Sequence, residues 1–217
     1  MVLEDQMKKI SIILALIMFF AVASASLAAD EKTKALFDDL LKIAEKCTNN
    51  ASVSMEAKST MNGKEFVTKL KLYFKDMKNF RMDSDTNGQK MRMVVTPAAA
   101  WTFVESSNVI MTMDPAAAGN FNVKELIEKQ KESSEITESK DGDNRVFTIV
   151  DKESKNKNTY AIDSKTGCYV KMSVHNGKGE LLTEATYSDW KFDKIDDALF
   201  KKPEGAKEVP MPEKGRK

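Results

Sequence analysis

The chain has 217 residues, of which 41% are hydrophobic and 31% charged, and 34 basic side chains balance 33 acidic ones. This length fits one domain, and the apolar fraction is large enough for a packed core. A net charge of +1 gives no global field for binding nucleic acid. One histidine and two cysteines cannot supply a four-ligand Cys/His zinc site, so the composition argues against catalysis, and we expect no metal and no cofactor.

The N-terminus has the regions of a secretory signal peptide in the usual order. Two lysines precede an apolar run at residues 10–22, and mostly small residues follow at 23–29. The run is too short to span a bilayer comfortably, although an uncleaved anchor helix is the alternative. Translation starts at either Met1 or Met7. The sequence therefore predicts a cleaved signal peptide over residues 1–29 and a periplasmic protein.

Cys47 and Cys168 lie far apart in a chain that we expect to be exported. An oxidising compartment allows them to form a structural disulfide. Two buried free thiols are the alternative. Neither cysteine lies in a C-x-x-C motif or beside a histidine, so the sequence gives no sign of a redox site.

The mature chain reads as one helix followed by many strands. Apolar residues recur three and four apart over residues 31–47, which predicts an amphipathic helix that packs on another layer. Alternating segments then follow, separated by turns such as Asn62-Gly63 and Asn87-Gly88, which favour antiparallel hairpins. A capped apolar pattern at residues 122–129 predicts a second, short helix.

These elements define a fold class, which is α+β and mainly β. We expect a large curved antiparallel sheet, an incomplete barrel, with helices covering its concave apolar face. The domain should span residues 30–205. Residues 206–217 are rich in charge and proline, and we expect them to form a flexible tail.

Several segments resemble the outer-membrane lipoprotein-sorting (LolA-like) carriers. The C-terminal half carries Tyr160-Ala161-Ile162-Asp163-Ser164-Lys165-Thr166-Gly167, Tyr187-Ser188-Asp189-Trp190 and the segment 196–206. In the N-terminal half, residues 72–82 and 95–103 resemble the strands with that family's P-x-x-F-R and G-x-x-x-W patterns. The resemblance implies an incomplete antiparallel barrel whose hydrophobic cavity holds lipoprotein acyl chains under a helical lid.

The chain departs from the family at the turn that locks the lid. The carriers have an arginine followed by a proline there, whereas Asp76 and Met77 stand at the corresponding positions. We take Asp76 and Arg81 as the candidate lid or latch turn. A solvated charge on the outer face of the sheet is the alternative for Arg81.

Methionine is abundant, with 13 residues, and several share the alternation phase of apolar strand residues. Thioether side chains adapt to flexible acyl chains, although ordinary core packing is the alternative. An aromatic core pair is likewise the alternative for Trp101 and Phe103. The candidate lipid-cavity residues are Leu36, Leu40, Met55, Phe66, Leu70, Leu72, Phe74, Met91, Met93, Trp101 and Phe103.

Together these features favour a periplasmic carrier that binds acyl chains of lipoproteins or lipids and moves them towards the outer membrane. A non-transport envelope sensor or binding module with the same cavity is the alternative, and an enzyme is a third class that we do not expect. The carrier hypothesis implies an inner-membrane release complex and an outer-membrane receptor as partners. We expect a monomer that does not bind nucleic acid.

Overall fold

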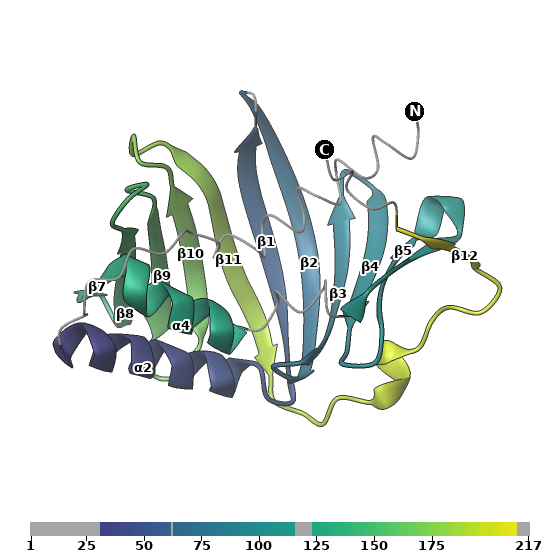
Figure 1. Ribbon diagram of the computed structural model, residues 1–217, viewed down its shortest axis with the longest axis horizontal. Coiled ribbons are helices and arrows are strands. Elements are labelled where there is room, and N and C mark those ends of the chain that lie inside the picture. Colours follow the sequence, from purple (N-terminus) through teal and green to yellow (C-terminus); the bar gives the residue numbers. More distant parts are fainter. Residues whose placement is uncertain (1–30, 62, 116–122, 212–217) are drawn as a thin grey trace.

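The computed structural model describes residues 31–61, 63–115 and 123–211. The predicted signal peptide and the last six residues of the predicted tail lie outside these ranges. The described residues form one curved sheet of twelve strands and two α-helices (Figure 1). The strands are β1 (Ala51–Met61), β2 (Lys64–Asp76), β3 (Asn79–Thr86), β4 (Gln89–Val95), β5 (Ala100–Val104), β6 (Val109–Met113), β7 (Ser134–Asp141), β8 (Asn144–Asp151), β9 (Lys157–Asp163), β10 (Tyr169–His175), β11 (Leu181–Lys191) and β12 (Lys207–Pro210).

The sheet joins two antiparallel meanders. Its order is β12-β6-β5-β4-β3-β2-β1-β11-β10-β9-β8-β7, so the first strand pairs with β11 from the C-terminal half, for example Met55 with Tyr187. Asn87 and Gly88 both have positive φ, as the tight turn between β3 and β4 requires. The ends of the sheet, β12 and β7, do not pair with each other, so the barrel stays open. The predicted fold class is confirmed.

Both predicted helices are present and lie over one half of the sheet. Helix α2 (Glu31–Cys47) has the predicted bounds, and α4 (Val123–Ser133) extends about a turn beyond its prediction. Figure 1 shows the two helices side by side in front of β7–β11. The inward face of α2 buries Phe37, Leu40 and Ile43 in the main core. Burying such side chains contributes roughly 1.5–3 kcal/mol each.

Ion pairs fix α2 to its neighbours. Arg145 on β8 bonds Asp39 of α2 and, at 2.6 Å, Glu138 of β7. Lys131 of α4 lies 2.6 Å from the carboxylate of Asp38, and this hydrogen bond lowers the pKa of the Asp38 carboxyl. The charged outer face of α2 therefore ties the helix to both α4 and the edge of the sheet.

The C-terminal segment folds back over the convex face. Phe200, in a short 3-10 helix η3 (Asp197–Phe200), packs against a cluster of Val94, Trp101 and Ile110. Beyond it, β12 pairs in parallel with β6 and begins at Lys207. This strand lies within the segment that the sequence analysis assigned to a flexible tail, so that prediction was wrong for residues 207–210. The alternation of a four-residue strand is too short to be recognised in a charged sequence.

The two cysteines lie together but are free thiols. Cys47 ends α2 and Cys168 precedes β10, and both are buried. The predicted disulfide is therefore wrong for this structure, which has the alternative of two buried thiols. Burial and the proximity of Cys168 raise the pKa of the Cys47 thiol to about 12. The pair packs in the core between the end of the helix and the late strands.

Three buried or half-buried tyrosines and a buried cysteine make the fold sensitive to alkali. Burial raises the pKa values of Tyr160, Tyr169 and Tyr187 above 10.0, and that of Cys47 to about 12 from 9.0. Above about pH 9 the unfolded chain loses these protons first, so the folded state binds more protons and the free energy of unfolding falls as pH rises. We expect urea unfolding to show a progressive loss of stability from pH 9 to pH 11.

The variant Tyr160→Phe provides the control, because it keeps the buried ring and removes one ionisable hydroxyl. Its stability should fall less steeply over the same alkaline range. An identical pH dependence in the two proteins would contradict the assignment of Tyr160 to this effect.

Candidate functional site

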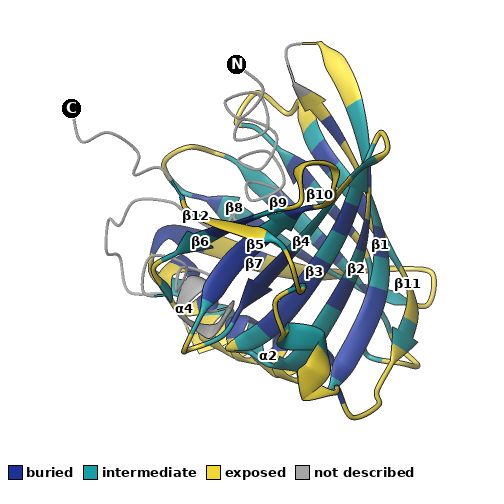
Figure 2. Ribbon diagram, turned by 90° about the vertical axis from the view of Figure 1, so that its right-hand side faces the viewer, coloured by how far each residue is buried: buried dark blue, intermediate teal, exposed yellow. Residues whose placement is uncertain are grey.

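The register of β2–β6 places their side chains in continuous rows that cross the concave face from strand to strand. Residues directly opposite each other in paired strands share a face. One row is Leu72, Met82, Met93, Thr102 and Met111. The next rows are Phe74, Phe80, Val95, Ala100 and Met113, and Leu70, Ser84, Met91, Val104 and Val109. Burial alternates only in part along these strands (Figure 2): Phe80, Arg81 and Met82 are buried one after another in β3, because the C-terminal segment covers part of the convex face as well.

The concave side of the β1–β6 half is rich in methionine. We call its methionines the methionine face: Met55, Met82, Met91, Met93, Met111 and Met113. Met93 is 2% exposed and Met82 3%, whereas Met91 and Met113 are half-buried. The sequence analysis did not include Met82, Met111 and Met113 among the cavity candidates, although their alternation in the strands was visible.

Most of the predicted cavity residues lie on the concave side. Met55, Leu70, Leu72 and Met93 are buried in the main core, with Phe74 and Met91 packed against it. Leu40 joins the same core from α2, and Leu36 is partly buried beside it. Phe66 shares the phase of Leu70 near the start of β2 and is half-buried. Their role in ligand binding remains a prediction.

The assignment of Trp101 and Phe103 to this face was wrong. Trp101 pairs with Val94 and Phe103 with Arg92, so both point to the convex face, where Trp101 is 1% exposed. The reason lies in the turn between β4 and β5. Because Val95 pairs with Ala100, odd residues of β4 oppose even residues of β5, and Met93 shares its face with Thr102.

The predicted latch residues, Asp76 and Arg81, form hydrogen bonds within the sheet and with the C-terminal segment. Asp76 closes the β2–β3 turn by accepting hydrogen bonds from the backbone N–H groups of Lys78, at 2.7 Å, and Asn79, at 2.8 Å. Arg81 is on the convex face and only 8% exposed, so a solvated charge was not the right alternative. Its guanidinium pairs with Asp83 and donates to the carbonyl oxygen of Leu199 at 3.1 Å, holding the C-terminal segment.

This geometry gives a prediction for the turn. Replacing Asp76 by alanine leaves the N–H groups of Lys78 and Asn79 without their carboxylate acceptor, much like the loss of a helix N-cap. We expect the free energy of unfolding to fall by about 0.5–2 kcal/mol. Urea denaturation of Asp76→Ala beside Asp76→Asn, whose amide oxygen still accepts hydrogen bonds, tests this. Equal losses in both variants would contradict a capping role.

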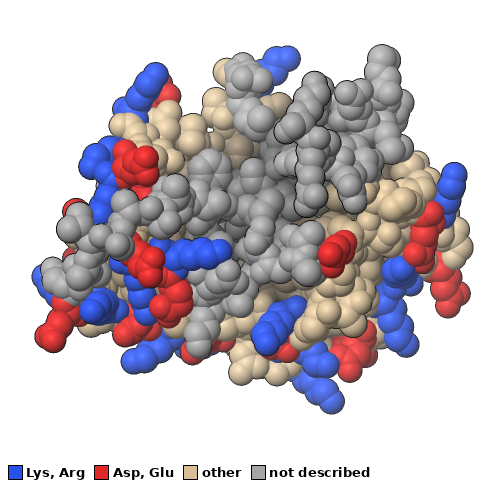
Figure 3. All heavy atoms as spheres, viewed as in Figure 1, with Lys and Arg blue, Asp and Glu red and all other residues tan. Residues whose placement is uncertain are grey.

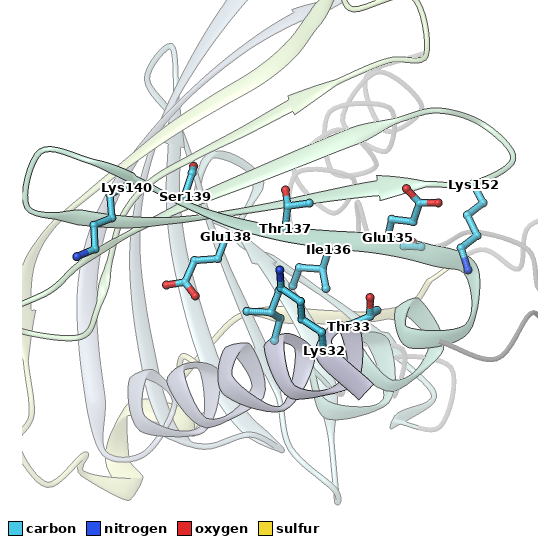
Figure 4. Close-up of a pocket in the computed structure, with 11 residues that line it drawn as sticks. Lys32, Thr33, Glu135, Ile136, Thr137, Glu138, Ser139, Lys140 and Lys152 are labelled. Atoms are coloured by element: carbon cyan, nitrogen blue, oxygen red, sulfur yellow. The ribbon is translucent and has the colours of Figure 1, made fainter. Parts of the chain in front are cut away.

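Two hollows are lined by polar residues. One, of about 890 Å³, lies between the first turns of α2 and the edge strand β7 (Figure 4). The other, of about 530 Å³, lies mostly over charged residues of the convex face, among them Glu56, Lys69, Asp85 and Lys90. On the face shown in Figure 3, basic and acidic side chains of the described residues are interspersed.

Two further observations concern metals and membranes. Within the described ranges, no group of three or more His, Cys, Asp or Glu side chains is placed to hold a metal ion. Neither described helix has the length and apolarity needed to cross a bilayer.

The open, curved sheet with two helices over half of its concave face is the incomplete barrel that the resemblance to lipoprotein-sorting carriers implied, so that expectation is confirmed at the level of the fold. No protein-family model matches the chain, and no curated protein matches it in sequence.

Solved structures of similar fold are distant in sequence. An uncharacterized conserved protein from Thermus thermophilus has a TM-score of 0.56 at 11% identity, covering 82% of this chain and 99% of that one. The Pseudomonas aeruginosa MucA/MucB complex gives a TM-score of 0.50 at 14% identity, covering 80% of this chain and 62% of that one. A LolA superfamily protein from Nitrosomonas europaea gives 0.41 at 10% identity, covering 78% and 97%. The first two likenesses establish the fold alone.

Proposed function

We propose that the protein is a periplasmic carrier that binds acyl chains of lipoproteins or lipids on the methionine face and moves them towards the outer membrane. The observation that carries the proposal is the concentration of methionine on one side of the β1–β6 half. Methionine is unbranched and has a polarisable sulfur, so it adapts its shape to flexible ligands. Removing an acyl chain from water contributes about 0.8 kcal/mol per buried CH₂.

The two halves of the sheet differ in a way that suits this role. Arg145 and Lys131 anchor α2 and α4 over β7–β11, while the methionines belong to the other meander. Because Met82 and Met93 are almost fully buried in the main core, a ligand would have to displace side chains that pack on them. The anchored half can keep its packing while that displacement takes place.

Export and partners form part of the same proposal. Cleavage of residues 1–29 would release a monomeric mature chain into the periplasm. A carrier would receive its cargo from an inner-membrane release complex and deliver it to an outer-membrane receptor. N-terminal sequencing of the periplasmic protein should find a first residue between Ser26 and Asp30, and recovery of Met1 or Met7 would contradict export by cleavage.

A sensor or binding module is the second candidate function. The similar fold in the MucA/MucB complex supports it, because that structure pairs a chain of this architecture with a protein partner. A carrier must give up its acylated cargo, whereas a sensor need only bind it. Transfer of a fluorescent triacylated lipopeptide from the loaded protein to outer-membrane vesicles would distinguish them.

Mass spectrometry of lipids that copurify with the exported protein tests the common basis of both candidates. We expect acylated species in near-stoichiometric amount after purification without detergent. A protein that carries no lipid and that also fails to bind an environment-sensitive fatty-acid probe would contradict lipid binding, and the carrier proposal with it.

A further inference from the structure

The hollow beside β7 has the form of a groove along a strand edge. It is lined by Lys32, Thr33, Leu36, Lys152 and the seven consecutive residues 134–140 of β7. Side chains of a strand point alternately to opposite faces. A hollow that touches every residue of the run must therefore follow the backbone edge of β7. Figure 4 shows the side chains of this run pointing alternately to the two sides of the strand.

The edge of β7 has room for another strand. β7 is the last strand of the sheet and pairs only with β8, from Ser134 opposite Asp151 to Asp141 opposite Asn144. The backbone groups on its other side therefore take no part in the ladder of the described sheet. Such an edge is a template for an added strand. Helix α2 lies alongside and supplies one wall, including the apolar side chain of Leu36.

The charge of the groove is positive. Lys32, Lys140 and Lys152 line it, and none of them forms an ion pair within the described part of the chain. The carboxylate of Glu138 is already bonded to Arg145 at 2.6 Å, which leaves Glu135 as the unpaired acid. Three free ammonium groups therefore face one free carboxylate.

We infer that this groove binds an extended acidic segment of a partner protein, which adds to the sheet as a strand beside β7. Backbone hydrogen bonds to β7 would supply the affinity. The lysines would select carboxylate side chains and speed the encounter. A second copy of this chain is disfavoured as occupant, because pairing two β7 edges would bring together two sets of the same unpaired lysines. The inference concerns a surface separate from the methionine face, so it does not depend on lipid binding.

The test uses a fluorescein-labelled peptide of eight residues in which glutamate alternates with valine, and the purified exported chain. Fluorescence anisotropy should show saturable binding that weakens as salt is raised. A peptide with lysine in place of glutamate should bind at least about tenfold more weakly. A peptide N-methylated at alternate residues should lose binding, because it cannot complete the ladder. Hydrogen exchange should slow at the amides of residues 134–141 when the acidic peptide is present.

Charge reversal places the peptide on the groove. The double variant Lys32→Glu/Lys140→Glu should weaken binding about tenfold or more, whereas Lys178→Glu, on the exposed β10–β11 turn, should leave it unchanged. Circular dichroism and fatty-acid probe binding should be the same in all three proteins, which separates this site from the lipid proposal.

Several outcomes would overturn the inference. The inference is wrong if the acidic peptide does not bind below about 1 mM, or if the acidic and basic peptides bind equally well. It is also wrong if hydrogen exchange slows only in strands other than β7. A dimer of the peptide-free chain whose contact protects residues 134–141 would assign the edge to a second copy instead. Binding of anionic lipid vesicles that is abolished by the same lysine reversals, with no peptide binding, would make the groove a lipid-headgroup site and refute the peptide.

Discussion

Replacing Met93 by glutamine is expected to weaken binding of a fatty-acid probe by about tenfold or more, because the change puts an amide where an acyl chain would pack. Met93 lies in the middle of the methionine face, opposite Met82 and Thr102, and is 2% exposed. Since its side chain is buried, the same change should also cost about 1–3 kcal/mol of stability. Binding must therefore be measured well below the unfolding temperature and compared with a matched variant.

Met172→Gln is that control. Met172 is also on the concave side, is 8% exposed, and belongs to β10 in the half that α2 and α4 cover. We expect Met172→Gln to lower stability by a similar amount and to leave probe binding nearly unchanged. If both variants lose binding to the same extent, the effect reflects general loosening of the core, and the methionine face is packing rather than a site.

Replacing Trp101 by alanine is expected to reduce the free energy of unfolding by about 3–5 kcal/mol while the folded protein keeps its affinity for the probe. Trp101 is 1% exposed on the convex face, where it joins Val94, Ile110 and Phe200. Its removal leaves a large void on the side away from the methionine face. It should also release the C-terminal segment that carries η3.

Urea denaturation and a probe titration at low temperature check this prediction, with Trp101→Phe as the conservative variant. Trp101→Phe should recover part of the stability because it fills part of the void. A marked loss of affinity in either variant without a corresponding loss of stability would place Trp101 at the ligand and contradict the register of β4 and β5.

Local patterns predicted most of the secondary structure. Apolar spacing identified α2 to the residue, and alternation between turn segments that contain Gly, Asn or Asp located the strands of both meanders. These signals are short-range, because helix and strand periodicity depend only on neighbours in sequence. The same patterns, together with the resemblance to lipoprotein-sorting carriers, led to the open curved sheet.

The sequence did not determine which faces of neighbouring strands lie on the same side of the sheet. Alternation predicts that Trp101 and Phe103 share one face of β5, and that Met91 and Met93 share one face of β4. The register of the β4–β5 hairpin decides whether these two faces lie on the same side of the sheet. A shift of one residue reverses every side chain. Only the tertiary structure showed that the aromatic pair faces away from the methionines.

Long-range contacts were likewise decided by the fold alone. The sequence shows Arg81 only as a charged residue within an alternating strand. In the structure Arg81 is buried, and the carbonyl oxygen of Leu199 in the C-terminal segment accepts a hydrogen bond from its guanidinium. The pairing of β1 with β11 and of β12 with β6 unites distant segments, and so leaves β7 as the free edge beside α2. The sequence by itself determined which segments are helix and strand and which residues of each share a face. The tertiary structure decided which faces meet, because burial and strand pairing depend on residues far away in the chain.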